Sequence, residues 1–285
     1  MISASDLLFI QQINNKTFDQ LSVYDYWLQN HEEPNDARLH RLLDHEYLYE
    51  SNDITLRLSQ FTIPTLKKLL KAHHLKVSGN KNELLQRLGE HETSLSLENL
   101  TIKPVYTANH DILPLIKYTT FLVYLSMNGP LSIEEGYAFY LKHQAMSNED
   151  LIINLYKEKI AQSKNTYLII KCHLFLSDYY KKLNDQRESL RHLNHFAMSL
   201  VLNAINRYLE NGNYLDSFFN IDHYTLDKYR NLLLMKQYSI NELYEYLLSD
   251  LEGDSHHHTL AAQYIIRSII DSPLAETKLL EELNK

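Results

Sequence analysis

The shortage of residues that interrupt a helix constrains this fold more than any other feature of the sequence. Glycine and proline occur only 6 times each among 285 residues, whereas sandwiches and barrels of many short strands need frequent turns that these residues favour. Hydrophobic residues make up 44% and charged residues 22% of the chain, as in a folded protein rather than a disordered one. We therefore predict a mainly α-helical fold, with at most a minor β element near residues 45–50.

The region 108–285 shows the helical pattern most clearly. Short clusters of Asn, Gly, Asp, Ser and Pro divide its apolar segments. Such punctuation is typical of antiparallel helices joined by short turns, so we predict a multi-helix bundle or a helical-repeat-like domain. The expected helices lie near 111–127, 131–145, 149–162, 166–183, 187–210, 224–236, 239–250, 258–271 and 273–284.

The region 1–54 is acidic and is expected to form a small helical unit. It holds ten Asp or Glu against three Lys or Arg, a net charge of −7. One short helix is predicted over 22–30, and a second begins with Asn35 or Asp36 as its cap. A helix followed by the alternating residues near 45–50 also fits the part of a winged-helix domain that precedes its wing. The alternative is a helical packing unit that supports the next segment.

A strongly basic segment follows between residues 55 and 88. It has seven Lys or Arg against one acidic residue, a local charge of +6 in a chain of −8, so the remaining residues sum to −14. A basic segment in an acidic protein is a candidate contact surface for a polyanion such as DNA or RNA. We refer to residues 55–90 as the basic module.

The basic module carries the pattern of two short amphipathic helices. Thr62 is placed to cap the first helix, Gly79 gives backbone freedom at the bend, and Asn80 with Glu83 forms a variant of the capping box for the second. Both helices are too short to be stable alone, so we expect their apolar residues to pack against one another, Val77 and the neighbouring region. Those apolar residues are Leu66, Leu69, Leu70, His73, Leu84, Leu85 and Leu88.

These residues closely resemble a SAP domain, a helix–extended loop–helix module associated with DNA, often AT-rich and read with little sequence specificity, and sometimes with RNA. The shared pattern is Thr-x-x-x-Leu-Lys-x-Leu-Leu from Thr62, His-Leu-x-Val-Ser-Gly from His74 and Lys-x-Glu-Leu-Leu-x-Arg-Leu from Lys81. The resemblance covers about 30 of the 285 residues and implies a phosphate-facing edge at 79–82. A histidine pair and Asn80 replace positions that are commonly basic, which lowers the positive potential. The nucleic-acid-binding residues that this implies are Lys67, Lys68, Lys71, Lys76, Ser78, Gly79, Asn80, Lys81, Asn82 and Arg87.

Two looser resemblances concern the rest of the chain. The arrangement is similar to SAP-bearing proteins of Gram-positive phages and mobile elements. The hairpin at 174–200 resembles a tetratricopeptide repeat, but no second copy matches as well at a 34-residue period, and repeat arrays need about three. A generic bundle is therefore favoured over a repeat array. Helical layers of this kind often hold partners, so we expect a protein partner or a homodimer through this domain.

Other candidate sites have simpler structural explanations. The three consecutive histidines from His256 diverge, whereas a zinc site needs converging ligands. His192 and His195 can share a helix face, but packing explains that spacing. Cys172 lies in an apolar run and is expected to be a buried thiol. The sequence shows no catalytic or phosphate-loop motif, so we expect no enzyme activity, no catalytic residue, no cofactor and no metal.

The cysteine count and the N-terminus bear on the compartment. A single cysteine cannot form an internal disulfide. The N-terminus lacks the basic start and apolar core of a signal peptide, and no run approaches the roughly 18 apolar residues of a membrane-spanning helix. We expect a cytoplasmic protein that does not contact membranes.

The predicted organisation has four parts: an acidic region 1–54, the basic module 55–90, a linker 91–107 and a helical domain 108–285. The main hypothesis is a non-enzymatic protein or adaptor that binds duplex DNA with little sequence specificity and uses its helical domain for dimerisation or protein partners. The alternative is a protein-binding helical scaffold without nucleic-acid contact. The third is a nucleic-acid-processing enzyme without a recognisable motif.

Overall fold

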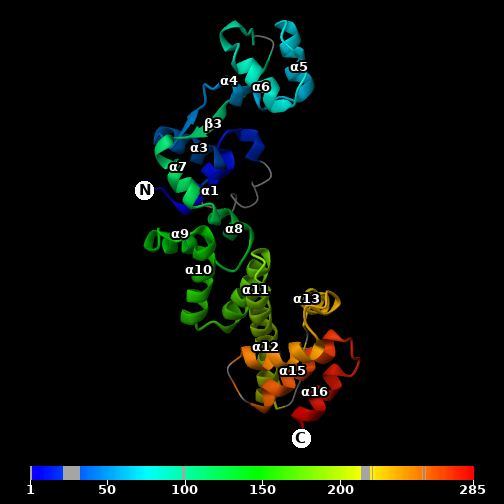
Figure 1. The fold of residues 1–285 in the computed structure, drawn as a ribbon. Helices are drawn as coiled ribbons and strands as arrows, with labels where there is room; N and C mark the ends of the chain where they lie inside the picture. The colour runs from blue at the N-terminus through cyan, green and yellow to red at the C-terminus, as the bar shows by residue number, and fades with distance from the viewer. Residues whose placement is uncertain are drawn as a thin grey trace. The chain divides into compact units, whose positions relative to one another are not determined.

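A computed structural model gives the structure of the chain, and it is mainly α-helical with one small sheet (Figure 1). The predicted fold class is confirmed. The chain divides into two compact units, a first of residues 1–127 and 131–151 and a second of residues 128–130 and 152–285. The structure describes residues 2–21, 33–97, 100–212, 219, 221–251, 253 and 255–285.

The first unit contains a small antiparallel sheet in the order β1–β3–β2, formed by β1 (Lys16–Thr17), β2 (Leu48–Glu50) and β3 (Val105–Ala108). Strand β2 confirms the β element expected near 45–50. Strands β1 and β3 were not predicted, because β1 has only two residues and β3 is buried at three of its four positions, so neither shows the alternation that marks a strand. Strand β3 begins inside the predicted linker and pairs with both other strands, so the end of that segment is structured.

The helices of the first unit are α1 (Ala4–Ile13), α3 (Asn35–Asp44), α4 (Ile54–Leu58), α5 (Ile63–Ala72), α6 (Lys81–Gly89), α7 (Leu113–Tyr118), α8 (Phe121–Met127) and α9 (Ile133–Lys142). Pro34 occupies the N-cap of α3, so the predicted cap at Asn35 or Asp36 is wrong. The helix predicted over 22–30 lies outside the described residues.

The single helix predicted over 111–127 is two helices, α7 and α8, divided at Thr119. The hydroxyl of Thr119 donates to the carbonyl of Leu115, and the amide of Gln11 donates to the carbonyl of Thr119. A side chain that bonds the preceding turn competes with helix continuation. This buried threonine therefore ends α7, and apolar periodicity alone did not reveal the break.

The second unit is entirely helical in its described part. Helix α10 (Asn148–Gln162) spans the division between the units. The other helices follow the predicted ranges to within about three residues. They are α11 (Thr166–Lys182), α12 (Gln186–Glu210), α13 (His223–Leu234), α14 (Ile240–Asp250), α15 (His256–Ile269) and α16 (Ala275–Leu283).

Helices α11 and α12 form an antiparallel hairpin, in which Ser189 donates to the carbonyl of Ser177. Asn184, at φ 62°, takes the left-handed conformation that ends a helix. The hairpin lies where the repeat-like pattern was noted, and its relation to tetratricopeptide repeats stays a prediction. Side chains of α12 form much of the unit's core with Tyr229, Leu243 and Ile265.

Helices α7 to α9 lie in the first compact unit, and the predicted four-part division of the chain stays a prediction. In the described part of the chain, no helix combines the length and the apolar character required to cross a membrane.

Candidate nucleic-acid interface

Three helices of the basic module enclose a core made of leucine and isoleucine. Leu66 and Leu70 of α5 and Leu84 and Leu88 of α6 are fully buried, and Leu58 of α4 closes the cluster. This confirms that the two predicted helices bury their leucines against each other. The expected place for Val77 in this core is wrong, since its side chain is 39% exposed.

Helix α4 provides the apolar side chains that complete this core, the role expected of Val77. Asp53 caps this helix, because its carboxylate accepts from the backbone N–H groups of Thr55 and Leu56. Five residues are too few to show a helical stripe. The cap was therefore the one local signal that could have revealed the helix.

The start of α6 is held by the predicted capping box. The Asn80 side chain accepts from the Glu83 N–H at 3.1 Å, and the Glu83 carboxylate accepts from the Asn80 N–H at 2.9 Å. This confirms the predicted capping box. It also means that the N–H group of Asn80 is already bonded, so fewer N–H groups of the expected phosphate-facing edge are free. Of the N–H groups at this helix start, those of Lys81 and Asn82 have no partner among the described residues.

Gly79 is required by the same box. Its φ of +128° suits glycine, and a Cβ at this position would lie 2.3 Å from Oε2 of Glu83. A side chain here would displace the carboxylate that caps α6. The glycine thus keeps the bend close to the helix start.

Two of the predicted phosphate-binding cations hold the module together instead of projecting freely. The guanidinium of Arg87 donates to the carbonyls of Lys76 at 2.5 Å and Ser78 at 3.2 Å. The ammonium of Lys81 donates to the carbonyl of Ser59 at 2.6 Å. Arg87 was expected to point outward, but its side chain lies against the extended link between α5 and α6 and bonds two of its carbonyls.

The other predicted residues lie on the surface of the module. Lys67, Lys68 and Lys71 project from α5 on the side away from its leucines, and Lys76 projects from the link. In the described part of the chain, none of these four lysines forms an ion pair. The remaining exposed members of the predicted set are Ser78, Gly79, Asn80 and Asn82.

The acidic N-terminal region does not neutralise these lysines in the part that is described. Asp6 is buried and binds Arg41 at 2.7 Å, while Glu33 binds the same arginine at 2.6 Å. Burial raises the pKa of Asp6, but hydrogen bonds from Arg41 and Ser3 outweigh it and lower the pKa overall. These two carboxylates are thus engaged within the N-terminal region itself.

The segment that follows the module is joined to the turn between α4 and α5. The Gln60 carboxamide donates to the carbonyl of Lys103 and accepts from its N–H, both at 3.1 Å. The Lys103 ammonium also lies 2.7 Å from a carboxylate oxygen of Asp19. These contacts hold the segment just before β3 next to the turn between α4 and α5.

The histidine candidates have structural positions. His256 begins α15, where Ser255 is the cap, and no described group of three His, Cys, Asp or Glu is placed to hold a metal. His192 and His195 pack in the interior against His173, whose Nδ1 lies 2.9 Å from Nδ1 of His192. The i, i+3 spacing revealed the pair, but the third histidine comes from the neighbouring helix.

Comparison with known proteins supports the module and leaves the remainder unmatched. Residues 57–93 match the family model of the SAP domain. Neither the curated proteins nor the solved structures gave a match to the chain. The family match coincides with α5, the link and α6, and it supports a SAP-type module with a general role in nucleic-acid binding.

Proposed function

We propose that the chain is a non-enzymatic, cytoplasmic nucleic-acid-binding protein or adaptor whose basic module contacts the backbone of duplex DNA. The observation that carries this proposal is a set of exposed lysines on a SAP-type module, none of which forms an ion pair with a described residue: Lys67, Lys68, Lys71 and Lys76. Ammonium groups on flexible side chains bind phosphates but read little sequence. The proposal therefore includes weak sequence preference.

The module's parts have distinct roles in this proposal. The lysines of α5 provide the charge, while the N–H groups of Lys81 and Asn82 can donate to a phosphate at the start of α6. The Glu83 carboxylate lies at the same helix start, so the lysines must provide most of the attraction. In this proposal the main role of Arg87 is to position the link through the two bonds that its Nη1 donates.

A salt titration with matched charge variants tests the proposal. Fluorescence anisotropy would follow a labelled 20-base-pair duplex binding to the whole chain between about 50 and 200 mM salt. Lys67→Glu/Lys71→Glu should weaken binding at least tenfold and reduce the slope of log K against log salt by about 2. Lys142→Glu/Lys278→Glu changes the charge equally at exposed residues outside the module. Equal binding by the two double variants would overturn the proposal.

The second unit supports a further element of the proposal, a contact with a protein partner or a second copy. Leu234 is 78% and Met235 69% exposed at the end of α13. Adjacent apolar side chains of this size are typical of contact surfaces rather than solvated ones. Light scattering of the whole chain and of Leu234→Ser/Met235→Ser tests self-association. A monomeric mass for the unsubstituted chain across micromolar concentrations would exclude the dimer.

A further inference from the structure

The second unit also contains a basic stretch, and no recognisable nucleic-acid-binding motif coincides with it. The region 108–285 has a net charge of −5, yet residues 157–209 hold nine Lys or Arg against four Asp or Glu, a net charge of +5. These residues include all of α11 and nearly all of α12. The hairpin itself, from residue 166 to residue 210, has six Lys or Arg against four Asp or Glu, a net charge of +2, and the other cations of this stretch lie just before α11.

Part of this charge lies on one side of α11. Tyr167, Lys171, Asp178 and Lys181, hereafter the α11 face, fall within roughly 80° at the helical repeat. The opposite side of α11 is buried against the core and includes Leu176. Tyr167 is 68% exposed, and the Lys171 ammonium lies 5.4 Å from its ring centre. The face thus presents a cation beside an exposed aromatic ring.

Helix α13 extends this face and cancels its one negative charge. The ammonium of Lys228 lies 2.6 Å from Asp178 and 4.5 Å from the ring centre of Tyr224, which is 62% exposed. No ion pair involves Lys171 or Lys181 within the described residues. The combined surface has two exposed tyrosines and a net positive charge.

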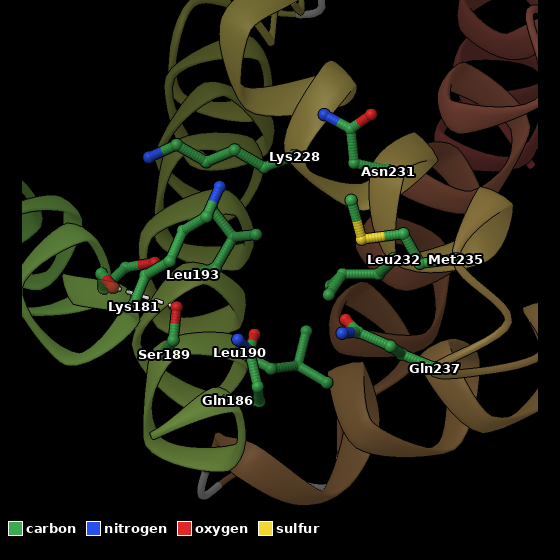
Figure 2. Close-up of a pocket in the computed structure, with 11 residues that line it drawn as sticks. Lys181, Gln186, Ser189, Leu190, Leu193, Lys228, Asn231, Leu232, Met235 and Gln237 are labelled. Atoms are coloured by element: carbon green, nitrogen blue, oxygen red, sulfur yellow. Dashed lines mark hydrogen bonds between the residues drawn. The ribbon is translucent and has the colours of Figure 1, made fainter. Parts of the chain in front are cut away.

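A pocket of about 100 Å³ opens beside the α11 face (Figure 2). Lys181 and Lys228 line it together with the apolar side chains of Leu190 and Leu232. This volume exceeds that needed for one water molecule several times over. Polar residues on its rim are Gln186, Asn231 and Gln237.

The polar groups of the pocket differ in whether they are already bonded. Ser189 donates to the carbonyl of Ser177, shown dashed in Figure 2. The carboxamides of Gln186, Asn231 and Gln237 have no hydrogen-bond partner within the described residues. Figure 2 shows the carboxamides of Gln186 and Gln237 on opposite sides of the pocket. They remain available to a ligand that has both donors and acceptors.

One class of ligand has the complementary groups. Phosphates pair with lysines, unpaired bases stack on tyrosine rings, and base edges offer donors and acceptors to carboxamides. A duplex covers the faces of its bases, whereas a single strand exposes them. We propose that the α11 face, with Tyr224 and the adjoining pocket, is a second nucleic-acid contact and binds a single-stranded segment. The inference rests on the proposed function for the class of ligand, but it does not depend on the basic module.

Binding of a single strand to the whole chain tests this site separately from the module. The probe is a fluorescein-labelled 20-nucleotide single-stranded DNA of mixed sequence, compared with the matching duplex. Lys171→Glu/Lys181→Glu should weaken single-strand binding at least tenfold and reduce its salt slope by about 1.4. The duplex affinity should change less than it does in Lys67→Glu/Lys71→Glu. Lys142→Glu/Lys278→Glu again controls for net charge.

The stacking component has its own test. Tyr167→Ala should weaken single-strand binding about fivefold or more, since a stacked base contributes roughly 1–3 kcal/mol. Tyr118→Ala, at an exposed tyrosine of the first unit, is the matched control. Tyr167 is on the surface, so its removal leaves the core intact.

The possible outcomes separate the two proposals. Single-strand binding by Lys171→Glu/Lys181→Glu equal to that of the charge control would overturn the second site, whatever the duplex result. If Lys67→Glu/Lys71→Glu nevertheless lost duplex binding, the proposed function would be supported without the second site. No binding of either probe by the unsubstituted chain would remove both.

Discussion

The basic module and the α11–α12 hairpin are both cationic, but their interiors are built differently. The module encloses leucines and an isoleucine, and none of its described buried side chains is ionisable. The hairpin encloses His173 and His192, with His195 packed beside them. A net positive charge is therefore combined with a pH-insensitive interior in one region and a pH-sensitive interior in the other.

A fall in pH should produce the largest difference in stability between the two regions. Burial, followed by the neighbouring charges, lowers the pKa of His173 and of His192 to about 3, compared with 6.5 in an unfolded chain. The unfolded state therefore binds protons first, so stability is present above about pH 6.5 and is lost as the pH falls toward 3. At pH 5 each histidine should lower the free energy of unfolding by about 2 kcal/mol, and the two together by about 4 kcal/mol.

Urea unfolding at pH 7.5 and pH 5.0, with hydrogen-exchange protection to assign each region, measures this loss. Protection in α11 should fall much more than protection in α5. His192→Phe should reduce the difference, whereas substitution of the exposed His256 by Gln should not. Equal losses of protection in both regions would contradict the contrast between their interiors.

A cavity in the module should have the next largest effect. Leu66→Ala removes a fully buried side chain from a small cluster, and such changes cost about 2–5 kcal/mol. The module should lose exchange protection and duplex binding, while α11 to α16 keep their helix content. Ile63→Ala, at an exposed position of the same helix, is the control. Retained protection of α5 in the Leu66 variant would show that the module does not depend on this core.

A change that preserves charge should have the smallest effect. Arg87→Lys keeps the positive charge, but its side chain is shorter, so its ammonium does not reach the position of Nη1, which donates to the carbonyls of both Lys76 and Ser78. We expect a loss of about 1 kcal/mol in module stability and several-fold weaker duplex binding. Lys68→Arg, at an exposed lysine, should bind as the unsubstituted chain does. Undiminished binding by Arg87→Lys would mean that only its charge matters.

Local patterns predicted the parts of the module that involve neighbouring residues. The Asn80–Glu83 box and the bend at Gly79 are decided within four residues, and the structure contains both. The contacts of Arg87 with the link and of Lys81 with Ser59 join residues 9 to 22 positions apart. Helical spacing contains no information about such distances, so both cations were assigned to the surface.

The same limit explains what was missed in the second unit. The helices of the bundle followed from apolar spacing and turn residues because those signals are local. The meeting of His173 with His192, and of Asp178 with Lys228, depends on which helices pack together. The charge summed over 108–285 also concealed the basic stretch 157–209, which lies between more acidic segments.

The position of the basic module between β2 and β3 has a practical consequence. These strands are antiparallel neighbours, and Ser51 N–H donates to the carbonyl of Val105 just beyond their paired residues. The module therefore lies within the connection between two hairpin strands, and the bonds between Gln60 and Lys103 tie it to the segment that leads into β3. An insertion of this kind is exchangeable: a short turn could replace it, or it could be transplanted into another hairpin, without redirecting the strands on either side.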